Sequence, residues 1–68
     1  MNLTAIRDKV DSRLEDLKAG VYCPREVEQY LRGMSAVLID AGTHETTMLA
    51  SVIGRHIFDI RKAQEVEA

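Results

Sequence analysis

The chain has few of the features that hold a very small protein together. Its 68 residues include one cysteine, one proline and no tryptophan, and only 4% of them are aromatic. A single cysteine excludes an intrachain disulfide, and the sequence has no cysteine and histidine spacing typical of a structural zinc site. A chain of this length buries only about 60% of the surface that its unfolded form exposes. We therefore expect self-association as a homo-oligomer, most simply a two-fold dimer, to complete its core.

The sequence also lacks an excess of positive charge and a long hydrophobic run. Its net charge is −2, so no broad basic field attracts phosphate backbones, and we do not expect nucleic acid as a partner. No apolar run approaches the roughly 18 residues of a membrane span. The first residues, MNLTAIRDKV, carry charges where a signal peptide has its apolar core. We expect no membrane partner and, given the free thiol, a cytoplasmic location.

Apolar residues three or four positions apart are present, and they predict an all-α fold. We expect one domain, residues 1–68, with helices over 2–19, 24–41 and 43–65. A glycine commonly ends a helix, a proline is tolerated in its first turn, and a threonine caps its start. The residues placed to mark these boundaries are Gly20, Pro24, Gly42 and Thr43. We expect an N-terminal helix followed by a helical hairpin, although the two-residue joint also permits a sharp corner.

The third predicted helix has two faces. At about 100° per residue, the broad apolar arc that we expect to face the core comprises Leu49, Val52, Ile53, His56, Ile57, Ile60 and Ala63. A narrower face holds small and aromatic residues at spacings of four, and these are Ala50, Gly54 and Phe58. A glycine inside a helix costs about 1 kcal/mol relative to alanine, and close contact with another helix would offset this cost. We therefore predict a protein contact surface that comprises Met48, Ala50, Gly54, Ile57 and Phe58. In the alternative interpretation, Phe58 folds back over the first helix.

His56 lies near the middle of the apolar arc and has two interpretations. An imidazole changes charge in the physiological pH range, so it can serve as a pH-responsive or ligand-binding group. Alternatively, it is a core or interface histidine that hydrogen-bonds a carbonyl, a tyrosine such as Tyr30, or the same residue of a second copy. The candidate ligand pocket, formed between protomers, comprises Tyr22, Arg25, Arg55 and His56.

The residue types that catalysis or metal binding requires are scattered along the chain. No recognisable metal-ligand spacing occurs, and we expect no metal or other cofactor. The candidate metal ligands are Cys23, His44, Glu45, His56 and Asp59. Arginines such as Arg7 and Arg13 suit a dianion, but we expect the neighbouring acidic residues to cancel their field. With no glycine-rich phosphate loop, catalytic carboxylate pair or nucleophile elbow, we do not expect an enzyme.

These features favour a small, non-enzymatic protein-binding module: an adaptor, inhibitor or chaperone-like subunit that presents a helical surface to a larger protein partner. A first alternative is an oligomer that sequesters a small ligand or nucleotide. A second alternative is a DNA-binding regulator in which the joint at Gly42 belongs to a helix-turn-helix. Its recognition helix would begin HETTMLASV, which has no arginine or lysine before Arg55, whereas such readers use basic residues early.

Overall fold

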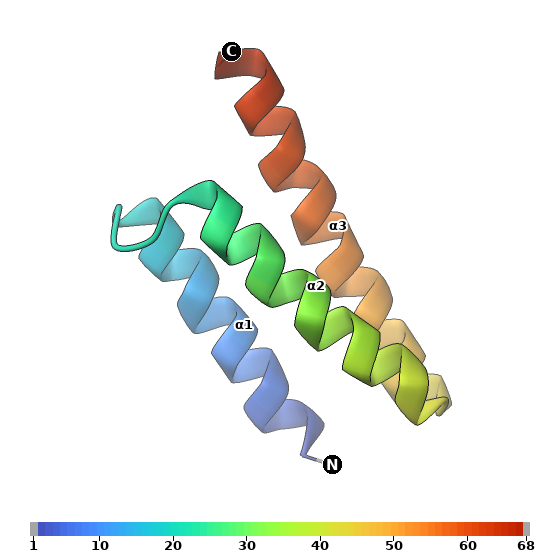
Figure 1. Cartoon of the computed structure of the whole chain (residues 1–68). Coiled ribbons are helices and arrows are strands. Elements are labelled where there is room, and N and C mark those ends of the chain that lie inside the picture. Colours follow the sequence, from blue (N-terminus) through green and yellow to red (C-terminus); the bar gives the residue numbers. More distant parts are fainter. Residues whose placement is uncertain (1, 68) are drawn as a thin grey trace.

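Three helices make up the structure. The computed structural model describes the backbone of residues 2–67 and the side chains of residues 2–65. The helices are α1 (Leu3–Lys18), α2 (Pro24–Ala41) and α3 (His44–Glu67), and the described residues contain no strand (Figure 1). The predicted all-α fold of three helices is therefore confirmed. Within residues 2–67, no helix combines the length and the apolar character needed to cross a lipid bilayer.

The ends of α1 and the start of α2 follow from local chemistry. The side-chain oxygen of Asn2 accepts a hydrogen bond from the backbone N–H of Ala5 at 3.1 Å, so Asn2 caps α1 and is not part of the helix. Gly20 has a φ of +80°, a left-handed conformation that a residue with a side chain adopts only with strain. The chain turns there and re-enters a helix at Pro24, whose missing N–H is not needed in a first turn.

Two threonines fix the joint between α2 and α3. Gly42 ends α2 with a φ of +71°. The hydroxyl of Thr43 then accepts from the backbone N–H of Thr46 at 3.1 Å, and the hydroxyl of Thr46 accepts from the backbone N–H of Thr43 at 3.0 Å. This reciprocal pair is a capping box in which threonine replaces the usual glutamate or glutamine. Because its hydroxyl also donates to the Thr43 carbonyl at 3.0 Å, Thr46 is buried with its polar atom satisfied.

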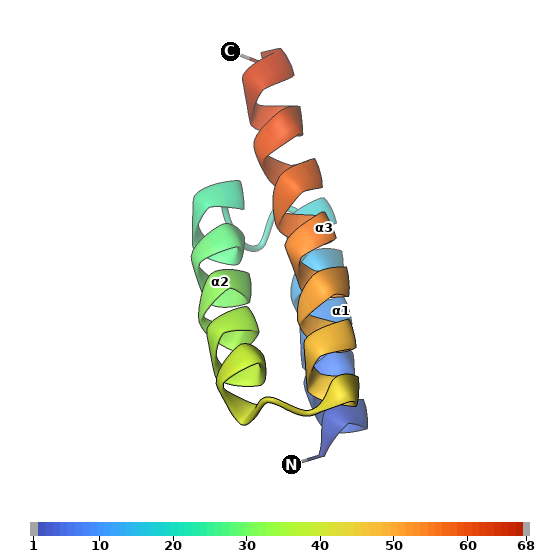
Figure 2. The ribbon, with the colours of Figure 1, turned by 90° about the vertical axis from the view of Figure 1, so that its right-hand side faces the viewer.

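Helices α2 and α3 run antiparallel and side by side, so they form a hairpin and not a corner (Figures 1 and 2). The seam between them is the centre of the core. Its fully buried side chains are Val27, Leu31, Leu38 and Ile53. Around them pack the buried residues Val10, Leu49, Ala50 and Ile60.

Helix α1 lies against both other helices and contributes less to the core. Val10 is its one buried residue among those described. Half-buried side chains complete the contact with the hairpin, and they are Leu3, Ile6, Leu14 and Leu17. At 24 residues, α3 is longer than α2 at 18, a difference of about 9 Å. The C-terminal end of α3 therefore projects beyond the other two helices (Figures 1 and 2).

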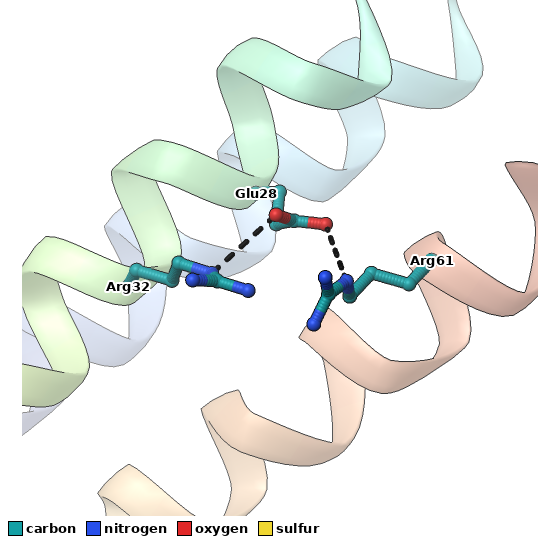
Figure 3. Close-up of polar contacts among 3 residues, drawn as sticks. All are labelled: Glu28, Arg32 and Arg61. Carbon is teal, nitrogen blue, oxygen red and sulfur yellow. Dashed lines mark ion pairs between the residues drawn. The ribbon is translucent and has the colours of Figure 1, made fainter.

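One carboxylate links the hairpin helices at their outer edge (Figure 3). Glu28 of α2 accepts from the Nε of Arg32, one turn later, at 3.4 Å and from the Nε of Arg61 of α3 at 3.5 Å. Both arginine side chains are more than half exposed. Solvent screens such pairs, which typically contribute about 1 kcal/mol or less each. The ion pairs therefore add little to the stability of the hairpin, and only the pair with Arg61 joins its two helices.

The rotation of α3 about its axis differs from the sequence-based expectation at three positions. Ala50, predicted on the outer contact face, is 5% exposed and belongs to the core. Val52, predicted in the core, is 50% exposed, and Ala63 is exposed as well. The reason is that the buried arc of α3 is centred on the seam with α2, so the flank toward α2 is covered. The flank toward the lightly packed α1 stays open.

We expect Thr43→Ala to lower the free energy of unfolding by about 1 kcal/mol, because α3 loses the hydroxyl that caps its first turn. The control is Thr4→Ala, an exposed helical threonine without a side-chain hydrogen bond to any described residue, which should change stability by less than about 0.5 kcal/mol. Urea denaturation followed by circular dichroism at one fixed protein concentration compares the two. Equal effects of the two substitutions would show that the threonine box does not stabilise the hairpin.

Candidate functional site

Two open cavities lie along the seam between α1 and α3, and we call them together the α1–α3 groove. The smaller, of about 280 Å³, lies near the start of both helices and is lined by Leu3, Arg7, Glu45, Met48, Leu49 and Val52. The larger, of about 530 Å³, lies near the end of α1 and is lined by Leu14, Leu17, Lys18, Pro24, His56, Asp59, Ile60, Ala63 and Gln64. Most of the surface lining both cavities is apolar. Both cavities are open to solvent because α1 packs lightly against the hairpin.

His56 is half-buried in the wall of the larger cavity. Lys18 and Asp59 line the same cavity, so the imidazole is placed among one positive and one negative side chain. Its side chain forms no hydrogen bond with another described residue, and Tyr30, a predicted partner, contacts Arg13 instead. His56 is therefore available to a molecule that enters the cavity.

The predicted contact residues divide between the surface and the core. Met48 is 57% exposed and Phe58 is 62% exposed, whereas Ile57 is half-buried against the core and Ala50 is buried. Gly54 is exposed, and a β-carbon built on it would meet nothing within 4 Å. Phe58 does not fold back over α1. Its ring lies 5.9 Å from the ammonium of Lys62, one turn further along α3.

The predicted ligand residues do not converge within one chain. Tyr22 contacts Arg13 of α1. Arg25 lies on the exposed first turn of α2 beside Cys23, whose thiol donates to a carboxylate oxygen of Glu26 at 3.1 Å. Arg55 is exposed on α3, and His56 belongs to the groove. A pocket built from these residues would therefore need a second protomer, as the sequence-based hypothesis supposed.

Arg13, whose field we expected the neighbouring acidic residues to cancel, contacts two aromatic rings. The Cζ atom of Arg13 lies 4.4 Å from the ring centroid of Tyr22 and 4.1 Å from that of Tyr30. These contacts join α1, the first connection and α2. Within the described side chains, Arg13 forms no ion pair, and the expected cancellation of its field by neighbouring acidic residues stays a prediction. The tyrosine spacing alone could not reveal this contact, because the arginine belongs to another helix.

The remaining polar residues form no recognisable metal centre. Among the described residues, no three histidine, cysteine, aspartate or glutamate side chains converge closely enough to hold a metal ion. No protein-family model matches the chain, and comparisons with curated proteins and with solved structures found no match either.

We expect the contact between Arg13 and Tyr30 to stabilise the fold by about 0.5–1 kcal/mol, the range of cation–π interactions at partly exposed sites. A double-mutant cycle with Arg13→Gln and Tyr30→Leu, analysed by urea denaturation, measures this coupling free energy. The matched control replaces Arg13→Gln by Arg7→Gln, since Arg7 lies on the same helix away from the ring. A coupling near zero in both cycles would contradict the stacked arrangement.

Proposed function

We propose that this chain is a small, non-enzymatic protein-binding module, an adaptor, inhibitor or chaperone-like subunit, that forms a homodimer and binds a larger protein partner. The observation that carries this proposal is the amount of exposed surface. The folded chain exposes 4933 Å² at a mass of 7.6 kDa, whereas a typical compact monomer of this mass exposes about 4,300 Å². A standard interface buries about 800 Å² on each partner. The excess is therefore close to what one protein interface covers.

The exposed surface of α3 has the chemistry of an interface. Of the six large apolar side chains among the described residues that are half or more exposed, three lie on α3, namely Met48, Val52 and Phe58. Phe58 is 62% exposed and therefore reachable by another chain, and Gly54, one turn earlier, leaves room for a second helix to approach. We assign the face of α3 that carries Gly54 and Phe58 to a second copy related by a two-fold axis, in which the same residues of both protomers meet.

The α1–α3 groove suits a helix of a larger partner. Its exposed apolar residues, Met48 and Val52, lie in the smaller cavity, and the larger cavity continues the apolar lining toward the end of α1. Amphipathic helices bind such grooves by inserting apolar anchors. Charges of both signs border each cavity, Arg7 and Glu45 at one and Lys18 and Asp59 at the other. These charges would set the direction and register of the bound helix.

Small-ligand sequestration is the second candidate, and the larger cavity favours it. Its volume of about 530 Å³ lies within the range of about 300–1,000 Å³ common for ligand pockets, which are also largely apolar with a few polar groups. His56 would be such a polar group. For either function we propose a cytoplasmic location, supported by the exposed free thiol of Cys23.

We expect Phe58→Ala to weaken self-association by at least about 30-fold, since truncating an interface anchor costs at least about 2 kcal/mol. Unfolding stability in dilute solution should be unchanged, because Phe58 is exposed in the monomer. Val37→Ala, an exposed apolar residue of α2, is the matched control. Native mass spectrometry reports the oligomer. A wild-type mass of twice the chain supports the dimer, an unchanged Phe58→Ala dimer contradicts this surface, and an added mass of a few hundred daltons supports sequestration.

We also expect Gly54→Ala to separate folding from association. A β-carbon meets no atom within 4 Å at Gly54 or at Gly33 of α2, so alanine should raise the stability of the dilute monomer by about 0.5–1 kcal/mol at either position. Only Gly54→Ala should also weaken the dimer, because the added methyl group holds the second helix away. Sedimentation velocity across a concentration series measures this. Tighter or unchanged association of Gly54→Ala would remove Gly54 from the proposed interface.

A further inference from the structure

A polar pocket on the opposite edge of α1 from the α1–α3 groove has no role in the proposed protein binding. It is open, has a volume of about 330 Å³, and lies between α1, the first connection and the start of α2. We call it the arginine–tyrosine pocket. Its lining residues are Lys9, Ser12, Arg13, Asp16, Tyr22 and Tyr30. Unlike the groove, its lining is mostly polar, so its chemistry is that of a charged ligand and not of an apolar anchor.

The guanidinium of Arg13 is held in place while its donors stay unused. Two tyrosine rings lie at 4.1 and 4.4 Å from its central carbon, and these contacts restrict the side chain. Its nitrogen atoms have no hydrogen-bond or ion-pair partner among the described residues. No described buried side-chain nitrogen or oxygen lacks a partner, so the unpartnered N–H groups of Arg13 are accessible to solvent. A restricted guanidinium presents a fork of donors that matches an oxyanion.

The other groups of the pocket complete a site for a doubly charged anion. Lys9 lies one turn before Arg13 on α1, so the lining holds two cations and one carboxylate, Asp16. Ser12 and both tyrosines also line the pocket, and each carries a hydroxyl group that can donate a hydrogen bond. A carboxylate has two oxygens and one charge, whereas a phosphate monoester has three terminal oxygens and up to two charges. The pocket has enough donors and positive charge for the latter.

We propose that the arginine–tyrosine pocket binds the phosphate group of a phosphate monoester. Arg13 supplies paired N–H donors, Lys9 supplies the second positive charge, and the hydroxyl groups accept or donate according to the protonation of the phosphate. Lys9, Arg13 and Asp16 together leave the lining with one net positive charge, so a dianion is attracted more strongly than a singly charged anion. The site is built from α1, the first connection and α2, and it shares no residue with the proposed dimer surface on α3.

Titration of the ¹⁵N-labelled protein with glycerol phosphate, followed by NMR, tests this proposal. We expect saturable shifts at the amides of residues 9–16, 22 and 30 and at the Nε–H of Arg13, with a dissociation constant on the order of 1 mM for so open a site. Inorganic phosphate is the second probe, and acetate at equal ionic strength is the control. Binding of inorganic phosphate without glycerol phosphate would reject the ester. Equal shifts with acetate, or no saturation with any probe, would overturn the site.

Variants of this pocket then assign the binding to Arg13. Arg13→Lys keeps the charge and loses the planar fork, so glycerol phosphate should bind about tenfold more weakly. The matched control is Arg7→Lys, on the opposite edge of the same helix, which should bind as the wild type does. Lys9→Gln is a second variant that leaves the tyrosine contacts intact and should also weaken binding. With circular dichroism showing a retained fold, unchanged affinity in both Arg13→Lys and Lys9→Gln would overturn the proposal.

Discussion

Burial of the seam between α2 and α3 is the constraint on which the rest of the molecule depends. Leu31 and Leu38 pack with Ile53 out of contact with water, and each such side chain contributes about 1.5–3 kcal/mol when it is fully buried. Because these side chains must face one another, they fix how α3 is rotated about its axis. That rotation buries Ala50 and leaves Phe58 exposed. The surfaces available for binding are thus set by what the hairpin must bury.

The position of α1 follows as a second, weaker consequence. Its apolar stripe reaches the hairpin through half-buried leucines and one buried residue, Val10. At the other edge of α1, the guanidinium of Arg13 contacts the rings of Tyr22 and Tyr30. A helix attached in this way does not close the seams beside it, so each edge of α1 borders an open cavity. The α1–α3 groove is mostly apolar because it borders the apolar stripe of α1. The arginine–tyrosine pocket is mostly polar because it borders the charged residues of α1.

The helices could be predicted from the sequence because their boundaries depend on local chemistry. Gly20, Pro24, Gly42 and Thr43 act within one turn of the chain, and their positions set the bounds to within about two residues, as is usual for helix ends. The exposure of Val52 could not be predicted, since it depends on how closely α1 packs. The contacts of Arg13 could not be predicted for a similar reason. Counting neighbouring charges along α1 takes no account of the tyrosine rings that a different helix and the connection bring to it.

Both proposed sites share α1 as a wall, and this has a physical consequence. Arg13 lies in the arginine–tyrosine pocket, and its neighbour in the sequence, Leu14, lines the larger cavity of the groove. Likewise, Tyr22 of the first connection lines the arginine–tyrosine pocket, whereas Pro24 at the start of α2 lines the larger cavity of the groove. Neighbouring residues of one helix thus belong to two surfaces of different chemistry, because successive side chains of a helix point about 100° apart. The light attachment of α1 leaves both of these surfaces open.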